Sequence, residues 1–172
     1  MGGARVLVRP GTVEDVELVM QLVRRVVPLM RASGNLQWDG KYPNAGVFNR
    51  DVELGYLWVA DIEGQIAGVA AITTDQELEY AQVGWDISEP AVVVHRLAVD
   101  PAYRGKGVAA GLMEQAEAVA RARGISVLRI DTNSQNEAAQ KLFPKLGYIF
   151  AGEIGLGFRP GLRFLCYEKR LV

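Results

Sequence analysis

The chain has 172 residues, of which 49% are apolar and 23% are charged. This length and apolar share are typical of one globular domain, and we expect residues 1–172 to form a single domain with a full hydrophobic core. The formal net charge of -1 argues against a nucleic-acid partner, and one cysteine and one histidine argue against an internal disulfide and a metal site. No apolar run is long enough to span a bilayer and the N-terminus lacks the apolar core of a signal peptide, so we expect a cytoplasmic protein that contacts no membrane.

The first third of the chain predicts one strand and two helices. Apolar and polar residues alternate over residues 6–9, which predicts a short strand. An apolar stripe at helical spacing begins at Val16 and predicts an amphipathic helix that Pro28 should kink or end. A second, shorter helix is expected to begin at Asn44 or Gly46.

Two polar segments carry aromatic side chains. Trp38 and Tyr42 lie in a loop rich in turn-forming residues after the first predicted helix. Tyr80 lies with Glu79 in the segment 75–90, for which the pattern predicts no element. Aromatic side chains in a polar loop either pack onto the core or line a pocket, and the sequence leaves both alternatives open.

The middle of the chain predicts a hairpin, in which the apolar run over residues 68–72 indicates a buried central strand, and then a further strand. The hairpin strands are expected over residues 56–61 and 65–74, with the turn at Glu63 and Gly64. The apolar run over residues 92–99 predicts the next strand, and the chain turns directly after it.

A glycine-bearing loop joins this strand to an amphipathic helix, and it consists of Arg104, Gly105, Lys106 and Gly107. The first N–H groups of a helix have no partners within the helix, so this point attracts anions. The two glycines let a phosphate approach the backbone, and Arg104 and Lys106 supply positive charge. The loop therefore predicts a phosphorylated ligand.

The rest of the chain predicts three strands and one helix after Gly124 ends the long helix. The expected elements are a parallel strand over residues 127–131, a helix over 136–145, and strands over 148–153 and 162–170. The order of all elements predicts an α/β fold, with a mixed sheet of about seven strands and helices on both faces.

Two motifs in the second half of the chain resemble those of one enzyme family. Arg104-x-x-Gly107-x-Ala109 resembles the Q/R-x-x-G-x-G/A signature of the GNAT superfamily of acyl-CoA N-acyltransferases. The segment that begins at Asn136 resembles the family's N-x-x-A-x-x-L-Y-x-x-x-G-F segment, with Phe143 in place of the usual tyrosine.

The resemblance implies the GNAT fold, in which a twisted, mixed but mostly antiparallel sheet contains a splayed strand pair. The strand that ends at Val99 would splay from the strand over 127–131, and the pantetheine of acetyl-CoA would add between them like a further strand. The implied acetyl-CoA contacts are Leu97, Ala98 and Val99 on the strand, Arg104, Gly105, Lys106, Gly107, Val108 and Ala109 on the loop and helix, and Asn136.

Acetyl transfer to an amine also requires a group that takes a proton from the nitrogen. Asp131 ends its predicted strand beside the splay, where ribosomal-protein N-acetyltransferases of the family carry a glutamate, and it is the predicted base. Glu79 is a rival. The ordinary pKa of histidine suits the role at neutral pH, but a packed, hydrogen-bonded ring is the favoured interpretation of His95.

In the family a tyrosine usually donates a proton to the CoA sulfur, and Phe143 takes its place in this chain. Tyr148, Tyr167 or Cys166 could substitute, and Tyr148 is the residue we predict. Alternatively the thiolate leaves unaided, since a thiol with a pKa of about 8.5 is a tolerable leaving group.

The resemblance thus implies an N-acetyltransferase that moves the acetyl group of acetyl-CoA to a primary amine, more readily of a small molecule than of a peptide. Trp38, Tyr42 and Tyr80 are the predicted acceptor-binding residues. The alternative is an acyl-CoA-binding sensor or partner-binding module with little or no catalysis. The sequence leaves the acceptor, the acyl chain length and the formation of a homodimer open.

Overall fold

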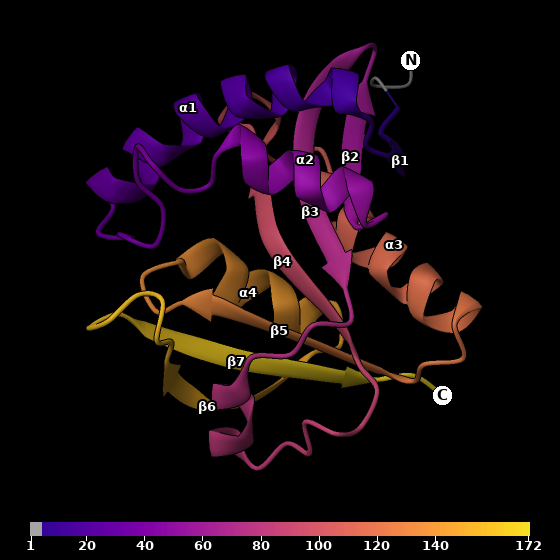
Figure 1. The fold of residues 1–172 in the computed structure, drawn as a ribbon, viewed down its shortest axis with the longest axis vertical. Coiled ribbons are helices and arrows are strands. Elements are labelled where there is room, and N and C mark those ends of the chain that lie inside the picture. The colour runs from indigo at the N-terminus through magenta and orange to yellow at the C-terminus, as the bar shows by residue number, and fades with distance from the viewer. Residues whose placement is uncertain (1–4) are drawn as a thin grey trace.

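The computed structural model describes residues 5–172, which fold around one sheet of seven strands (Figure 1). The strands are β1 (Leu7–Pro10), β2 (Leu57–Ile62), β3 (Gln65–Thr73), β4 (Val92–Val99), β5 (Val127–Asn133), β6 (Ile149–Gly155) and β7 (Arg163–Arg170). The helices are α1 (Val16–Ala32), α2 (Ala45–Glu53), α3 (Val108–Ala122) and α4 (Glu137–Lys145). Short 3-10 helices lie over Val13–Asp15 (η1), Leu78–Val83 (η2) and Pro101–Tyr103 (η3).

The strand order in the sheet is β1-β2-β3-β4-β5-β7-β6. Neighbouring strands are antiparallel except β4 and β5, which run parallel and pair only where Val92 and Val93 face Leu128 and Arg129. Beyond these pairs the two strands diverge, as Figure 1 shows. The mixed, mostly antiparallel sheet and its splayed strand pair are therefore confirmed.

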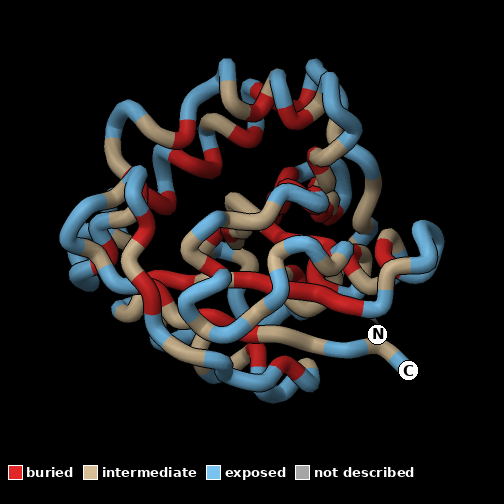
Figure 2. The backbone as a smooth tube through the Cα atoms, turned by 60° about the horizontal axis from the view of Figure 1, so that its bottom comes forward, coloured by how far each residue is buried: buried red, intermediate tan, exposed pale blue. Residues whose placement is uncertain are grey.

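Helices cover both faces of the sheet. Leu22 of α1 and Phe48 of α2 are fully buried on one face, against residues of β2 and β3. Leu112 of α3 and Phe143 of α4 are buried on the opposite face. In Figure 2 the buried positions follow the strands and the sheet-facing sides of the helices. The amphipathic patterns predict this layering, and the helices on the two faces hold β4 and β5 in their diverging positions.

The segment 74–91 covers the part of the sheet that α1 and α2 leave open. Tyr80 of η2 is fully buried there and belongs to one apolar cluster with Val93, Phe164 and Cys166. The sequence pattern could not assign this segment, because its one regular element is the six-residue 3-10 helix η2, which is too short to show a repeating apolar face.

Pro28 does not end α1, which continues to Ala32. Proline removes one backbone bond to the residue four positions earlier, in this case Arg24. Pro28 is exposed whereas Val26 and Val27 are buried, so the helix keeps its packed face and the freed carbonyl lies on the solvent side. Of the two predicted effects of Pro28, a kink or an end of the helix, the end does not occur.

Gly68 of β3 lies beneath the start of α3 and gives a test of this packing. A Cβ at this position would lie 2.5 Å from Cγ1 of Val108 and 3.1 Å from the carbonyl oxygen of Ala98. We expect Gly68→Ala to lower the free energy of unfolding by about 1 to 3 kcal/mol, because overpacking forces the helix or the strand to shift. Urea unfolding measures the change. Gly40→Ala, where a Cβ meets nothing within 4 Å, is the control, and equal losses in both variants would contradict the steric cause.

Residues 5–172 contain no group of three or more His, Cys, Asp or Glu side chains that could hold a metal ion. No helix in this part of the chain combines the length and the apolar character needed to cross a membrane.

Candidate active site

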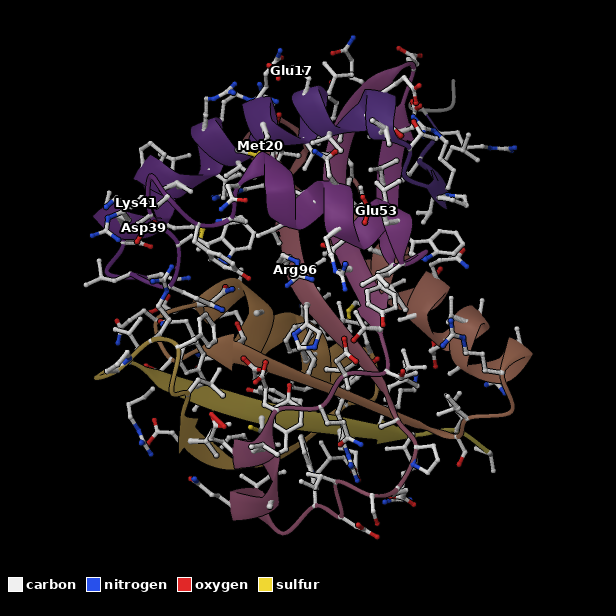
Figure 3. All side chains as sticks on the ribbon, viewed as in Figure 1. Glu17, Met20, Asp39, Lys41, Glu53 and Arg96 are labelled. Atoms are coloured by element: carbon white, nitrogen blue, oxygen red, sulfur yellow. The ribbon has the colours of Figure 1, made fainter. Side chains whose placement is uncertain are left out.

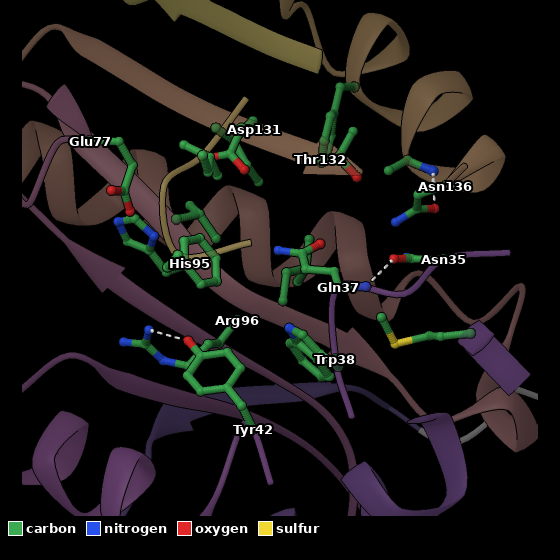
Figure 4. A pocket seen from close by; sticks show the side chains of 18 residues that line it. Asn35, Gln37, Trp38, Tyr42, Glu77, His95, Arg96, Asp131, Thr132 and Asn136 are labelled. Carbon is green, nitrogen blue, oxygen red and sulfur yellow. Dashed lines mark hydrogen bonds between the residues drawn. The ribbon is translucent and has the colours of Figure 1, made fainter. Parts of the chain in front are cut away.

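A cavity of about 310 Å³ lies where β4 and β5 separate (Figure 4). Its walls come from β4, β5 and α4, from the end of α1 and the loop between α1 and α2, from the segment 74–91, and from the loop between β6 and β7. Glu77, His95 and Asp131 lie toward one end, and Asn35 and Asn136 lie toward the other. The splay thus opens directly into a cavity that carries titratable groups.

The edge of β4 beside this cavity is free along residues 94–99. Pairing with β5 ends at Val93, so the backbone groups that face β5 beyond this point have no strand partner. Leu97 lines the cavity, Val99 packs on the α3 side of the sheet, and Ala98 packs on the α1 side. An open strand edge can accept an extended ligand as an added strand. The three residues predicted to bind pantetheine therefore lie on such an edge.

The predicted phosphate loop of Arg104, Gly105, Lys106 and Gly107 is exposed, directly before α3. Gly105 and Gly107 have φ angles of 75° and 77°, which a residue with a Cβ adopts only at a cost. Gly107 is the N-cap of α3 and no side chain caps the helix, so the first N–H groups stay available to an anion. The side chain of Val108 is buried, so Val108 can offer an anion only its backbone N–H group. The same group is what Ala109 would offer.

Asn136 caps α4 at the cavity wall. Its Oδ1 accepts a hydrogen bond of 3.1 Å from the backbone N–H of Ala139. The side-chain amide nitrogen is left to donate to a ligand, which fits the predicted contact with the pantetheine arm.

A bulge in β4 presents an arginine that the sequence did not single out. The register shifts between the pairs Val69 with Ala98 and Ala71 with His95, and Arg96 has a φ angle of 53°. The shift places Arg96 beside His95 on the cavity wall, although neighbours in a regular strand face opposite sides.

Arg96 is held by a buried carboxylate of α2. Its Nε and Nη2 donate to the two oxygens of Asp51 at 2.8 and 2.6 Å, and Nη1 lies 3.4 Å from the hydroxyl of Tyr42. Figure 3 shows Arg96 at the centre of the molecule, whereas Glu17, Asp39 and Lys41 lie at its periphery. A charged residue inside an apolar strand was the available signal for this position, because burial of a charge requires a partner.

Asp131 lines the cavity, as its predicted role requires, but it lies inside β5, which continues to Asn133 beyond the predicted end at residue 131. Its Oδ2 accepts a hydrogen bond of 2.5 Å from the hydroxyl of Tyr80. Burial raises the pKa of Asp131 to about 6, against the lowering effect of that hydrogen bond. Tyr80 itself is fully buried and does not line the cavity, so it supports Asp131 instead of facing an acceptor.

The segment 74–91 contributes Glu77 to the cavity, not Glu79. Burial raises the pKa of the Glu77 carboxyl. Glu79 points elsewhere and accepts the backbone N–H of Gly157 at 3.1 Å. The base predicted as a rival to Asp131 thus lies outside the cavity, and a carboxylate two residues earlier lies inside it.

His95 lines the cavity near Glu77, and Nε2 lies 2.9 Å from the backbone carbonyl oxygen of Asp75. Burial lowers the pKa of the imidazole, so the ring is neutral near pH 7. The ring is hydrogen-bonded, as the sequence interpretation expected, and it also forms part of the cavity wall.

The residues proposed to replace the missing tyrosine do not line the cavity, whereas Phe143 does. Tyr148 is 4% exposed, its hydroxyl has no hydrogen-bond partner among residues 5–172, and burial raises its pKa, with the nearby charge of Glu117 adding to the effect. Tyr167 packs against Phe143 with ring centroids 5.4 Å apart, and burial raises the pKa of Cys166 to about 12. The placement of these residues gives no support to a role as proton donor.

Two loops that are distant in sequence meet at the cavity. Tyr42 and Phe158 pack with their ring centroids 6.1 Å apart, and Trp38 is 4% exposed beside them. Arg159 lies 5.3 Å from the centre of the Tyr42 ring and donates from Nε to the carbonyl oxygen of Gln37 at 2.7 Å. Of the predicted acceptor-binding residues, Trp38 and Tyr42 therefore line the cavity.

Relatives of known name share much of the sequence. The chain is 25% identical over 152 residues to the N-acetyltransferase YesJ of Bacillus subtilis, which covers 87% of this chain and 84% of that protein. It is 29% identical over 126 residues to N-acetylaspartate synthetase of Xenopus tropicalis, which covers 69% of this chain but only 42% of that longer protein.

Solved structures share the fold along nearly the whole chain. An acetyltransferase of the GNAT family from Streptococcus agalactiae has a TM-score of 0.83 at 24% identity and covers 99% of both chains. The acetyltransferase yncA from Salmonella typhimurium, solved with its cofactor acetyl-CoA, has a TM-score of 0.71 at 20% identity and covers 98% of this chain and 95% of that one.

The family model described as the acetyltransferase (GNAT) family matches residues 24–148, which is well over half of the chain. This range includes β4, the glycine loop, α3 and Asp131, and of the cavity walls it leaves out only the loop between β6 and β7. The chain therefore belongs to the acetyltransferase (GNAT) family of N-acetyltransferases.

Proposed function

We propose that this protein transfers the acetyl group of acetyl-CoA to a primary amine of a small molecule. The observation that carries the proposal is the carboxylate of Asp131, which has a pKa of about 6 and lines a cavity that opens on the splayed strands. A base with a pKa near neutrality suits the removal of a proton from an amine. A cavity of about 310 Å³ falls within the size range of small-ligand sites.

Acetyl-CoA would bind along the open edge of β4 and at the start of α3. The backbone of Leu97 and Val99 would hold the pantetheine, and the N–H groups that follow Gly107 would hold the pyrophosphate. The structure of yncA with acetyl-CoA supports this choice of donor, since its chain shares the fold. A backbone N–H near Val99 would polarise the thioester carbonyl, because it is already fixed in direction by the strand.

Asp131 would act on the nitrogen that attacks the thioester. It takes a proton as the new C–N bond forms, and the protonated carboxyl then gives that proton to the departing sulfur. Phe143 has no acidic proton, and it lines the same cavity as Asp131. Transfer from a carboxyl with a pKa of about 6 to a thiolate whose acid has a pKa of about 8.5 is downhill.

The test is turnover of acetyl-CoA with a panel of primary amines, followed by thiol release and by mass spectrometry of the product. Formation of an acetylated amine supports the proposal. Tight binding of CoA without any acetylated product would support the second candidate, a CoA-binding sensor, which Phe143 favours because it replaces the usual acid. The cytoplasmic location and the homodimer stay predictions.

Phe143→Tyr tests whether protonation of the sulfur limits the rate. Phe143 is 1% exposed and lines the cavity, and in the family the tyrosine at this position places its hydroxyl near the CoA sulfur. We expect a gain in kcat of less than about tenfold, because Asp131 already supplies a proton to the sulfur. If protonation of the sulfur limited the rate, a positioned donor would raise kcat by about a hundredfold or more. Turnover at saturating acetyl-CoA measures it. A gain of that larger size would mean that the native site is impaired and would favour the sensor.

A further inference from the structure

His95 is the one histidine of the chain, and its hydrogen bond fixes which nitrogen carries the proton. A carbonyl oxygen only accepts hydrogen bonds, so the contact of 2.9 Å with Asp75 requires Nε2 to be the donor. In the neutral ring Nδ1 then holds a free lone pair. Nδ1 has no hydrogen-bond partner within residues 5–172, and the ring forms part of the cavity wall.

The charges around His95 come from three elements. The segment 74–91 brings Asp75 and Glu77, β4 brings Arg96, and β5 brings Asp131 to the same end of the cavity. Arg96 is neutralised by the buried carboxylate of Asp51. Burial first, and Arg96 after it, lower the pKa of the imidazole, whereas Glu77 and Asp75 raise it.

In the proposed reaction the acceptor amine loses two protons, and Asp131 delivers only one of them to the departing sulfur. An amine bound as an ammonium ion loses one proton before it can attack and a second as the amide forms. The thiolate receives one of the two, through Asp131 in the proposed function. The other must leave the cavity for solvent in every turnover.

We propose that Nδ1 of His95 takes the first proton from the acceptor ammonium and that the neighbouring carboxylate of Glu77 passes it to solvent. His95 and Glu77 lie together in Figure 4, and Glu77 is half-buried, so it lies at the boundary between cavity and solvent. The nitrogen's lone pair is freed in this step, no bond other than the N–H bond breaks, and the thioester is untouched. This inference rests on the proposed amine acetylation and adds a second proton route to it.

One experiment observes the ring directly. Because the chain contains one histidine, the imidazole signals of the untagged, 15N-labelled protein belong to His95 alone. We expect the Nε2–H tautomer and a titration midpoint below about 6.5, the ordinary value. Glu77→Gln should lower the midpoint further because a stabilising negative charge is lost, and Glu79→Gln, whose side chain does not line the cavity, should change it less. An Nδ1–H tautomer would overturn the proposal.

The second experiment measures the proton step through its dependence on pH. His95→Gln keeps an N–H group for the Asp75 carbonyl but has no basic nitrogen, so we expect kcat at pH 7 to fall by about a hundredfold. The deficit should shrink as the pH approaches the pKa of the free amine, since the acceptor then enters already neutral. The KM for acetyl-CoA should not change. A deficit that is equal at all pH values would assign His95 a structural role and overturn the proposal.

The two proposals fail in different ways. If the unaltered protein acetylates amines and His95→Gln does so equally well at pH 7, the proton role of His95 is wrong and the proposed function stands. If the unaltered protein acetylates no amine in the panel, the proposed function fails and takes the proton role with it.

Discussion

Asp131→Asn is expected to lower kcat by about a hundredfold at neutral pH while the affinity for CoA stays unchanged, because an amide accepts no proton from the attacking nitrogen. Unlike the deficit of His95→Gln, this loss should persist at high pH, since the proton from the forming amide still needs an acceptor. In the native protein the acid limb of the kcat profile should have an apparent pKa near 6. Turnover and calorimetry with CoA measure these effects.

Asp86→Asn serves as the control, because Asp86 is exposed and does not line the cavity. It should keep both turnover and CoA affinity. Turnover of Asp131→Asn at the native rate would remove Asp131 from the chemistry and leave Glu77 and His95 as the acid–base groups of the cavity.

Asp131→Asn should not destabilise the fold. The pKa of Asp131 is raised from 3.8 to about 6, so the ionised carboxylate is less stable in the folded chain than in the unfolded chain. This destabilisation is absent near pH 3, develops as the pH rises between these two values and is complete above pH 6. Asparagine carries no charge and still offers an oxygen to Tyr80. We expect the Tm of Asp131→Asn to equal or exceed that of the native protein near pH 7.5, and a clear fall would contradict the burial of the charge.

The sequence predicted the elements of this fold because most of them carry a regular apolar period. The apolar run within residues 65–74, the stripe from Val16 and the glycine that ends α3 each determine an element by local rules. The splay between β4 and β5 has no local signature. It came from the family resemblance alone, and the structure confirms it through the two residue pairs at which the strands meet.

The candidate site was predictable where its residues lie on regular elements. Asp131 lies on a strand whose pattern is clear, and it lines the cavity. Glu77 was missed in favour of Glu79 because a 3-10 turn, not a strand or an α-helix, sets the direction of those side chains. Arg96 was missed because the bulge in β4 breaks the period of two on which strand predictions depend, and no glycine or proline marks it.

Tyr148 shows the limit of motif spacing for assigning a role. It was predicted to replace the proton donor that Phe143 lacks, and it lies in the same family segment as Phe143. The structure packs its ring 6.0 Å from that of Phe143, but its hydroxyl lies in the core near Glu117. Closeness of two rings therefore does not place the hydroxyl in the cavity.

Gly107→Trp is expected to abolish measurable binding of CoA while the chain stays folded. Gly107 is the N-cap of α3, and a pyrophosphate that receives the first N–H groups of the helix would have to pass directly over it. A Cβ at this position meets nothing within 4 Å, so the indole enters the space that the phosphates need without disturbing the core. The φ angle of 77° adds a strain of about 1 to 2 kcal/mol, which a domain of this size tolerates.

Gly64→Trp is a matched control for that strain. Gly64 lies in the turn between β2 and β3, has a φ angle of 83°, and likewise offers space in which a Cβ meets nothing within 4 Å. Both variants should therefore lose similar amounts of stability in thermal unfolding, but only Gly107→Trp should lose the calorimetric signal of CoA. If both proteins bind CoA as the native protein does, the phosphates do not lie at the start of α3, and the anion site deduced from the loop of residues 104–107 is wrong. If both lose binding equally, the loss comes from backbone strain and gives no information on where CoA binds.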